Sequence, residues 1–253
     1  MRFVRHATFV FEVDDLRIMV DPMLAPAGAA EPVANTPNKR HNPLVDLPLN
    51  DDETHALLEE IDAVLVTHTH NDHWDGEARS LIPEQAPILC QPEDEDKIRA
   101  SGFRQVTPVH YELEWKGLRL TRTGGQHGTG EIGRRMAPVS GFVVRDGSSP
   151  VLYVAGDTIW CPEVEEALGV HSPDVVVVNA GAARFLEGGP ITMTTEDVVR
   201  VCRALPDARV VAVHMEAINH CLLPRDALED ELRKESLATR VKIPADGETF
   251  EVP

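Results

Sequence analysis

Four side chains that could bind metal ions fall within six consecutive positions of this sequence. They are His68, His70, Asp72 and His73, in the segment HTHNDH. Imidazole nitrogens and carboxylate oxygens are ligands that zinc and its neighbouring transition metals bind in proteins. One tetrahedral ion cannot easily take four ligands from so short a loop, so the first two histidines could face one ion while Asp72 and His73 face a second. The spacing therefore predicts a two-metal site.

An apolar run, AVLV at residues 63–66, comes directly before this segment. Such a run is typical of a strand that is buried on both faces. The end of a buried strand can hold several side chains rigidly enough to converge on one point. A polar loop with incidental histidines is the alternative, but three histidines and one aspartate in six positions disfavour it.

The pattern His-x-His-x-Asp-His after a buried strand resembles the signature of the metallo-β-lactamase fold superfamily. The resemblance extends over nearly the whole chain and implies an α/β (α+β) fold of four layers, an αββα sandwich. The interleaved strands and helices of the sequence agree with one such domain over residues 1–253. In that family the metals lie at one end of the two sheets, and further ligands stand at the ends of later strands.

Three later residues match those further ligands, in the same order along the chain. His127 follows the strand LRLTRT, Asp157 follows VLYVA, and His214 ends RVVAVH. The resemblance implies that Asp157 bridges the two metals. It also implies that Asp21, after the strand RIMV, accepts hydrogen bonds from the ligand loop and so orients it. An aspartate that caps the turn with Pro22 is the alternative.

The N-terminal segments indicate one branch of the superfamily, and a long loop follows them. Residues 6–8 (HAT) and the pair Asp21-Pro22 most resemble the ascorbate-6-phosphate lactonase-like branch of the superfamily.

The stretch 23–50 is rich in proline and has no clear period. Loops of that length inside a compact domain are often lids or binding loops, so we expect a lid, with a surface insertion as the alternative.

His220 lies six residues after His214 and is a second candidate for a catalytic role beside Asp72. It could donate a proton to the leaving group, bind a substrate oxygen, or replace His214 as a ligand. A histidine buried near the site without such a role is the alternative. For its neighbour Cys221 we expect a thiol in the core rather than a metal ligand.

Three arginines follow candidate site segments and could bind an anionic substrate. They are Arg134, Arg135 and Arg184. A guanidinium group can pair with a carboxylate or phosphate through two parallel hydrogen bonds. Solvated surface arginines are the alternative. The other histidines have no partner that the sequence indicates, and we expect most of them on the surface or in loops: His6, His41, His55, His110 and His171.

Hydrophobic periodicity predicts the elements that position these residues. We expect a hairpin of two strands at the N-terminus, buried strands before each candidate ligand, and helices that cover the sheets. The predicted hairpin strands are 7–13 and 17–21, the helices are 52–60, 75–82, 194–206 and 224–237, and the last strand is 248–252.

Composition excludes some classes of partner. Lys and Arg total 24 against 42 Asp and Glu, which gives a net charge of −18 and argues against broad binding to nucleic acid or an anionic membrane. No apolar run approaches the roughly 18 residues of a membrane span. The N-terminus does not resemble a signal peptide, and the four cysteines are scattered, so we expect a reduced, cytoplasmic protein. A homo-oligomer is an open alternative.

Together, these features predict a metal-dependent hydrolase that acts on a small molecule. Two divalent ions, zinc first with manganese or iron as alternatives, would share a hydroxide that opens an ester or lactone of a small anionic substrate. Asp72 would bind a metal and orient the hydroxide, and His220 would serve as the acid. The alternative is a phosphodiesterase on a small anionic substrate. A non-catalytic metal-binding protein is disfavoured because every expected ligand is present.

Overall fold

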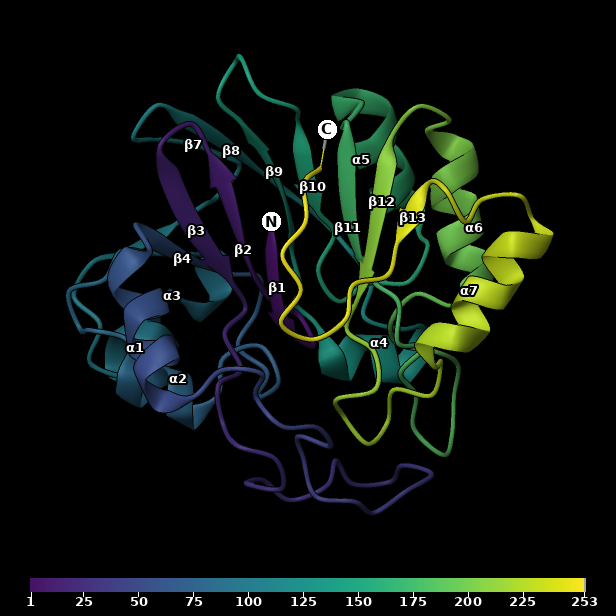
Figure 1. The fold of residues 1–253 in the computed structure, drawn as a ribbon, viewed down its shortest axis with the longest axis horizontal. Helices are drawn as coiled ribbons and strands as arrows, with labels where there is room; N and C mark the ends of the chain where they lie inside the picture. Colours follow the sequence, from purple (N-terminus) through teal and green to yellow (C-terminus); the bar gives the residue numbers. More distant parts are fainter. Residues whose placement is uncertain (253) are drawn as a thin grey trace.

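The computed structural model describes residues 1–252, which form two β-sheets packed face to face with helices on both outer sides (Figure 1). The first sheet has the strand order β1 (Arg2–Arg5), β2 (Thr8–Val13), β3 (Leu16–Val20), β4 (Ala63–Val66), β5 (Ile88–Cys90) and β6 (Val106–Pro108). The second has the order β13 (Val241–Lys242), β12 (Arg209–Val213), β11 (Val175–Asn179), β10 (Leu152–Val154), β9 (Gly141–Arg145), β8 (Leu118–Thr123) and β7 (Glu112–Trp115).

Helices complete the outer layers. The first sheet is covered by α1 (Asp51–Glu60), α2 (Gly76–Leu81) and α3 (Glu95–Ala100), with a short 3-10 turn at Pro92–Asp94. The second sheet is covered by α5 (Pro162–His171), α6 (Thr195–Ala204) and α7 (Arg225–Lys234). One further helix, α4 (Gly130–Met136), lies at the end of the molecule near the loop 23–50 (Figure 1). The predicted four-layer αββα sandwich is confirmed.

Strand β11 explains why these sheets have apolar runs rather than alternating patterns. Val175 and Val177 pack between the two sheets, whereas Val176 and Val178 pack against the helices of the outer layer. Successive side chains of a strand point to opposite faces, so a strand covered on both sides needs apolar residues at every position.

The strands that carry the candidate ligands end at one rim of the sandwich. In the first sheet, β3, β4, β5 and β6 are parallel neighbours. In the second sheet, β10, β11 and β12 are parallel, and β8 runs in the same direction because β9 is antiparallel to both of its neighbours. Residues that follow these strands therefore lie near one another although they are far apart in the sequence.

Most predicted elements are confirmed with shifted ends, and one is wrong. The N-terminal hairpin and the four predicted helices correspond to β2, β3, α1, α2, α6 and α7. The predicted strand 248–252 is not a strand, because Thr249 makes only an isolated bridge to Arg2. Phe250 and Val252 pack against the core between the sheets, and backbone hydrogen bonds join Glu248 and Phe250 to Phe3 and Met1, so the segment follows the first strand without forming a continuous ladder.

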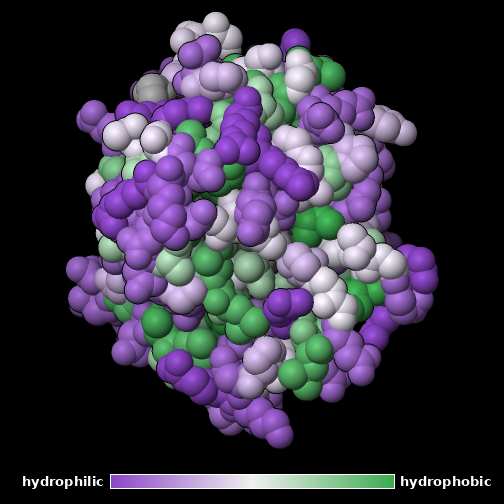
Figure 2. All heavy atoms as spheres, turned by 90° about the vertical axis from the view of Figure 1, so that its right-hand side faces the viewer, coloured by the Kyte–Doolittle hydropathy of each residue, from purple (hydrophilic) through white to green (hydrophobic). Residues whose placement is uncertain are grey.

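The surface beyond the core is mostly polar. Figure 2 shows the side of the molecule that α6 and α7 cover, where hydrophilic side chains predominate and hydrophobic ones gather toward the lower half. None of the helices in residues 1–252 has the length and apolarity that a membrane span requires.

Candidate metal centre

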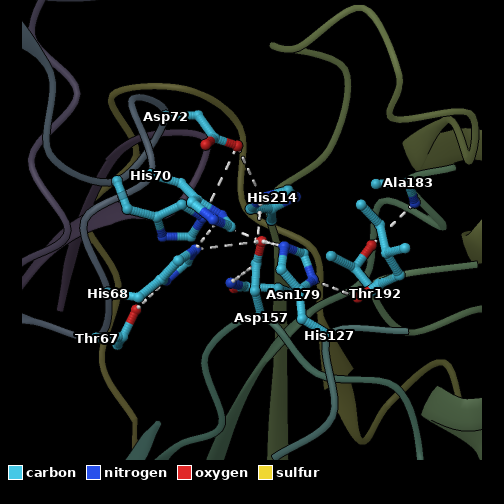
Figure 3. A network of polar contacts seen from close by, with 12 residues as sticks. Thr67, His68, His70, Asp72, His127, Asp157, Asn179, Ala183, Thr192 and His214 are labelled. Carbon is cyan, nitrogen blue, oxygen red and sulfur yellow. Dashed lines mark hydrogen bonds and ion pairs between the residues drawn. The ribbon is translucent and has the colours of Figure 1, made fainter. Parts of the chain in front are cut away.

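Seven residues predicted as metal ligands come together at the rim where the ligand-bearing strands end. Figure 3 shows all of them except His73 with labels. The ligand atoms at this rim form three groups, and the atoms within each group all lie within 4.8 Å of one another. The groups are His68, His70 and His127; His68, His73 and Asp157; and His6, Asp72, His73 and His214. The set spans both sheets, and the third group includes one histidine that the sequence did not indicate.

Asp157 lies at the centre of these groups. Its Oδ2 atom is 3.3 Å from Nε2 of both His73 and His127, and its Oδ1 atom is 3.3 Å from Nε2 of His214. The Oδ1 atom also accepts a hydrogen bond from the Asn179 amide at 2.6 Å. One carboxylate thus lies against imidazoles from three separate segments of the chain.

Gly156 turns Asp157 into this position. Its φ is +69°, and a Cβ atom there would lie 2.5 Å from the carbonyl oxygen of Ser140. Only glycine fits both the left-handed backbone and the close approach.

Hydrogen bonds on the far side of the rings orient two of the imidazoles. The Nδ1 atom of His73 lies 2.8 Å from Oδ2 of Asp21, and Nδ1 of His127 lies 2.7 Å from the carbonyl oxygen of Ile191. Each Nδ1–H can donate to these acceptors, which leaves the Nε2 lone pair directed into the site.

Asp21 also holds the strand end that precedes the histidine cluster. The backbone N–H and the hydroxyl of Thr67 both donate to its carboxylate at 2.7 Å. Nδ1 of His68 lies 3.1 Å from the same hydroxyl. Asp21 therefore has contacts of the orienting kind that the sequence predicted.

The donor set fits divalent metal ions. Nε2 atoms of His73 and His214 are buried and have no hydrogen-bond partner within residues 1–252, although carboxylate oxygens lie nearby. Buried polar atoms without partners are costly and rare. Ligands about 2.0–2.1 Å from a tetrahedral ion lie about 3.3 Å apart, which is the spacing seen between these nitrogens and Asp157.

The electrostatics divide the imidazoles into two kinds. Burial lowers the pKa of His68 and His127, so these rings are neutral, as metal ligation requires. Burial acts in the same direction on His73, but the carboxylates led by Asp157 outweigh it and raise its pKa to about 10. For Asp157, burial raises the pKa, but His214 and the other imidazoles outweigh this effect and hold it well below its ordinary value.

His6 is the residue that sequence reasoning missed. It is completely buried, and its Nε2 atom lies 3.2 Å from Oδ2 of Asp72. Burial lowers its pKa to about 3, so the ring is neutral. His6 lies in a turn, but the expectation that it has no partner is wrong, and it is not on the surface. The resemblance of the HAT segment to the family could have indicated His6 as a site residue. Its place near the metal centre, however, depends on the turn before β2.

A cavity of about 710 Å³ opens onto the metal centre. Its lining includes His70, Asp72, His127, Asp157 and His220, and the loop 23–50 contributes much of the rest. The other walls are mainly apolar: Met23, Ala25, Pro26, Ala29, Ala30, Pro32, Val33, Pro43, Met136, Phe185 and Ile218. The charged lining residues away from the centre are Glu31, Asp75, Glu77 and Arg79.

The three predicted anion-binding arginines lie elsewhere. Arg134, Arg135 and Arg184 are exposed, and among the described residues none of the three lines this cavity. Arg134 forms an ion pair with Glu131, and Arg135 lines a neighbouring cleft. These arginines follow site segments in the sequence and so lie at the same end of the molecule as the metal centre, but they do not reach it.

His220 lies in the cavity wall and is 5% exposed. Its Nδ1 atom has no hydrogen-bond partner among residues 1–252, and burial lowers the pKa of the ring to about 4. A neutral imidazole can offer a hydrogen bond to a substrate oxygen. Its neighbour Cys221 is partly buried, with Sγ 3.5 Å from Nδ1 of His214.

Buried polar side chains hold the loop 23–50 in place as a cavity wall. The guanidinium group of Arg5 is fully buried and donates to the carbonyl oxygens of Met23, Ala25 and Val45 at 2.8–3.0 Å. These contacts fix both ends of the segment that lines the cavity.

Asn219 holds the middle of the same loop. Its side-chain oxygen accepts from the Val33 N–H at 3.0 Å and the Asn42 amide at 2.9 Å. Its side-chain nitrogen donates to the Thr36 hydroxyl at 2.7 Å and the Asn38 carbonyl at 2.8 Å. Asn219 is completely buried and directly precedes His220, so loop and cavity wall depend on one amide.

We expect Asn219→Ala to loosen this loop. The change leaves the Val33 N–H and the buried Asn42 amide without the acceptor that they share, each at a cost of about 1–3 kcal/mol. Limited proteolysis should cut faster within residues 26–43, and KM for a substrate should rise. The exposed amide variant Gln85→Ala should behave like the original protein. Unchanged cleavage in Asn219→Ala would show that other contacts hold the loop.

Comparison with known proteins agrees with the geometry. The family model described as the beta-lactamase superfamily domain matches residues 17–215. The UPF0173 protein YddR of Bacillus subtilis is 37% identical over 250 residues, which cover 98% of this chain and 97% of that protein. Other relatives are named metal-dependent hydrolases, among them one from Thermoplasma acidophilum, 25% identical over 60% of this chain and 65% of its own.

Two solved structures closely match the whole chain. One is a possible metal-dependent hydrolase from Veillonella parvula, with a TM-score of 0.95, 33% identity, and coverage of 99% of this chain and 98% of that one. The other is an isothiocyanate hydrolase from Delia radicum gut bacteria, with a TM-score of 0.93, 35% identity and the same coverage. The chain therefore belongs to the metallo-β-lactamase superfamily, as a member of its beta-lactamase superfamily domain family.

Proposed function

We propose that this protein is a metal-dependent hydrolase with a binuclear centre that acts on a small organic electrophile. The observation that carries the proposal is the convergence of six donor side chains around a seventh, the carboxylate of Asp157, at the floor of a cavity. Zinc is the expected metal, with manganese or iron as alternatives. Bound there, two divalent cations would supply a nucleophilic hydroxide at neutral pH and stabilise the charge that develops on attack.

Each residue has a part that follows from its position. His68, His70 and His127 would hold one cation, and Asp72, His73 and His214 the other, with Asp157 between them. The cavity would bring a substrate to this centre, where the Asp72 carboxylate faces the open side and can orient the attacking water. The neutral ring of His220 would donate a hydrogen bond to the substrate.

The cavity favours an uncharged substrate over the anionic one expected from the sequence. Its walls are mainly apolar, and the single arginine, Arg79, is accompanied by Glu31 and Glu77. An organic isothiocyanate combines an apolar substituent with an electrophilic central carbon. The isothiocyanate hydrolase from Delia radicum gut bacteria, 35% identical over almost the full length, supports this substrate class.

The proposed reaction adds water across the isothiocyanate group. The oxygen of water forms a bond to the central carbon, and its protons pass to nitrogen as the carbon–nitrogen bond breaks. The products are a primary amine and carbonyl sulfide. Opening of an ester or lactone stays the sequence-based alternative, supported by the N-terminal resemblance to the lactonase-like branch, and phosphodiester cleavage stays a further one.

A substrate panel tests this proposal. The protein, stripped of metal and reloaded with zinc, is given benzyl isothiocyanate, a γ-lactone and bis-p-nitrophenyl phosphate. We expect amine release from the isothiocyanate with a kcat/KM at least about 100-fold above that for the diester, a difference of about 2.7 kcal/mol in transition-state stabilisation. The metal-free protein is the control. Faster turnover of the lactone would assign the protein to the lactonase-like alternative.

A further inference from the structure

His6 lies in the turn between β1 and β2, against the last candidate ligand of the chain. Its carbonyl oxygen accepts a hydrogen bond from the backbone N–H of His214 at 2.7 Å, and the two ring centroids are 3.7 Å apart. Both residues have left-handed backbones, with φ of +60° and +64°. Such a conformation is unfavourable in a residue other than glycine and persists only where the surroundings enforce it.

The ring of His6 also contacts the carboxylate of Asp72. Its Nε2 atom lies 3.2 Å from Oδ2, the same oxygen that lies 3.5 Å from Nε2 of His214 and 3.8 Å from Nε2 of His73. These four atoms form one of the groups that could surround a metal ion. His6 could therefore bind the cation itself or hold the residues that bind it.

The other ring nitrogen distinguishes these two roles. His73 and His127 each have an acceptor for Nδ1–H, namely Asp21 and the carbonyl of Ile191, so Nε2 is free to bind a metal. Nδ1 of His6 is buried and has no hydrogen-bond partner among residues 1–252. A proton at that nitrogen would be an unsatisfied buried donor, whereas a proton at Nε2 has the Asp72 carboxylate as its acceptor.

We propose that His6 is a positioning residue that donates Nε2–H to Asp72 and packs against His214, and so shapes the second cation position without binding the cation. This inference rests on the proposed binuclear centre. Partners that orient metal ligands typically change metal affinity by about 10–100-fold when they are removed. Removal of His6 should lower the metal affinity only of the position formed by Asp72, His73 and His214. The other position is formed by His68, His70 and His127, which His6 does not contact.

Two variants of His6 separate donation from packing. His6→Gln keeps an N–H donor at about the reach of Nε2, whereas His6→Leu fills the space without a donor. Zinc titrations against a chromophoric chelator measure the two binding constants. We expect His6→Leu to weaken one zinc equivalent by about 10–100-fold and leave the other unchanged, and His6→Gln to restore most of the loss. The exposed His55→Leu variant should retain both constants.

A measurement on the unaltered protein decides the case even if His6→Leu does not fold. Long-range ¹H–¹⁵N spectra of histidine-labelled protein report which ring nitrogen carries the proton, and His6→Gln assigns the His6 signals. We expect Nε2–H at His6 in both the metal-free and the zinc-loaded protein. A proton on Nδ1 with a metal-bound Nε2 would overturn the proposal, as would equal loss of both zinc equivalents in His6→Leu.

The same measurements distinguish failure of this inference from failure of the proposed function. Binding of fewer than two zinc equivalents by the unaltered protein would contradict the binuclear centre. The tautomer of His6 in the metal-free protein would still show whether it donates to Asp72.

Discussion

The Asp157→Asn variant is expected to lose metal-dependent activity by far more than the roughly 100-fold that follows loss of a residue that only orients ligands. Asp157 is 2% exposed and lies 3.3 Å from donor atoms of His73, His127 and His214, so its charge serves every part of the centre. An amide has the same shape but carries no charge and offers one acceptor oxygen in place of two.

Metal content and turnover should be measured on the same preparation of Asp157→Asn. We expect fewer bound zinc equivalents together with loss of turnover, while the far-ultraviolet circular dichroism spectrum stays unchanged. Asp96→Asn, at an exposed position of α3, is the matched control and should retain both properties. Full activity in Asp157→Asn would contradict the central role given to this carboxylate.

The affinity of the metal-free protein for zinc is expected to rise steeply with pH. Nearby carboxylates overcome burial and raise the pKa of His73 to about 10, and they raise the pKa of His214 well above its ordinary value. Both rings therefore carry a proton at neutral pH, and that proton must leave before the nitrogen can bind a metal. Each proton released makes the affinity about tenfold stronger per pH unit, up to the pKa of the group.

Chelator competition at pH 6, 7 and 8 measures this dependence, after correction for the proton competition of the chelator itself. Isothermal titration in two buffers with different ionisation enthalpies counts the released protons directly. We expect at least about one proton per protein at pH 7. Equal affinity at pH 6 and pH 8 would mean that these rings are already neutral in the metal-free protein.

Local sequence indicated the histidine cluster because it follows β4, a strand whose apolar run can be recognised. Asp157 and His214, like His127, were indicated by the resemblance to the metallo-β-lactamase superfamily, and the parallel strands that end at one rim explain why they lie near one another. The four-layer fold followed from the same interleaved strands and helices. Element ends were less certain, since caps such as Asn50 and Thr194 set them by individual hydrogen bonds.

The supporting residues could not be predicted in the same way. His6, Asn179 and Asn219 act through partners far along the chain, and nothing in their neighbouring residues marks those contacts. The arginines show the opposite error, because proximity in the sequence suggested a site role that the structure does not support. Arg134 follows a candidate site segment yet points to solvent, whereas Arg79, on α2, lines the cavity.

The order of the donors along the chain bears on how the protein matures during synthesis. The ribosome releases the N-terminus first, so the cluster at His68–His73 emerges long before His214. In the proposed binuclear centre, the position that uses His214 cannot be complete until β12 joins its sheet, whereas the donors of the other position all precede β12. The second cation of that proposed centre would therefore be inserted late, after the two halves of the sandwich have met.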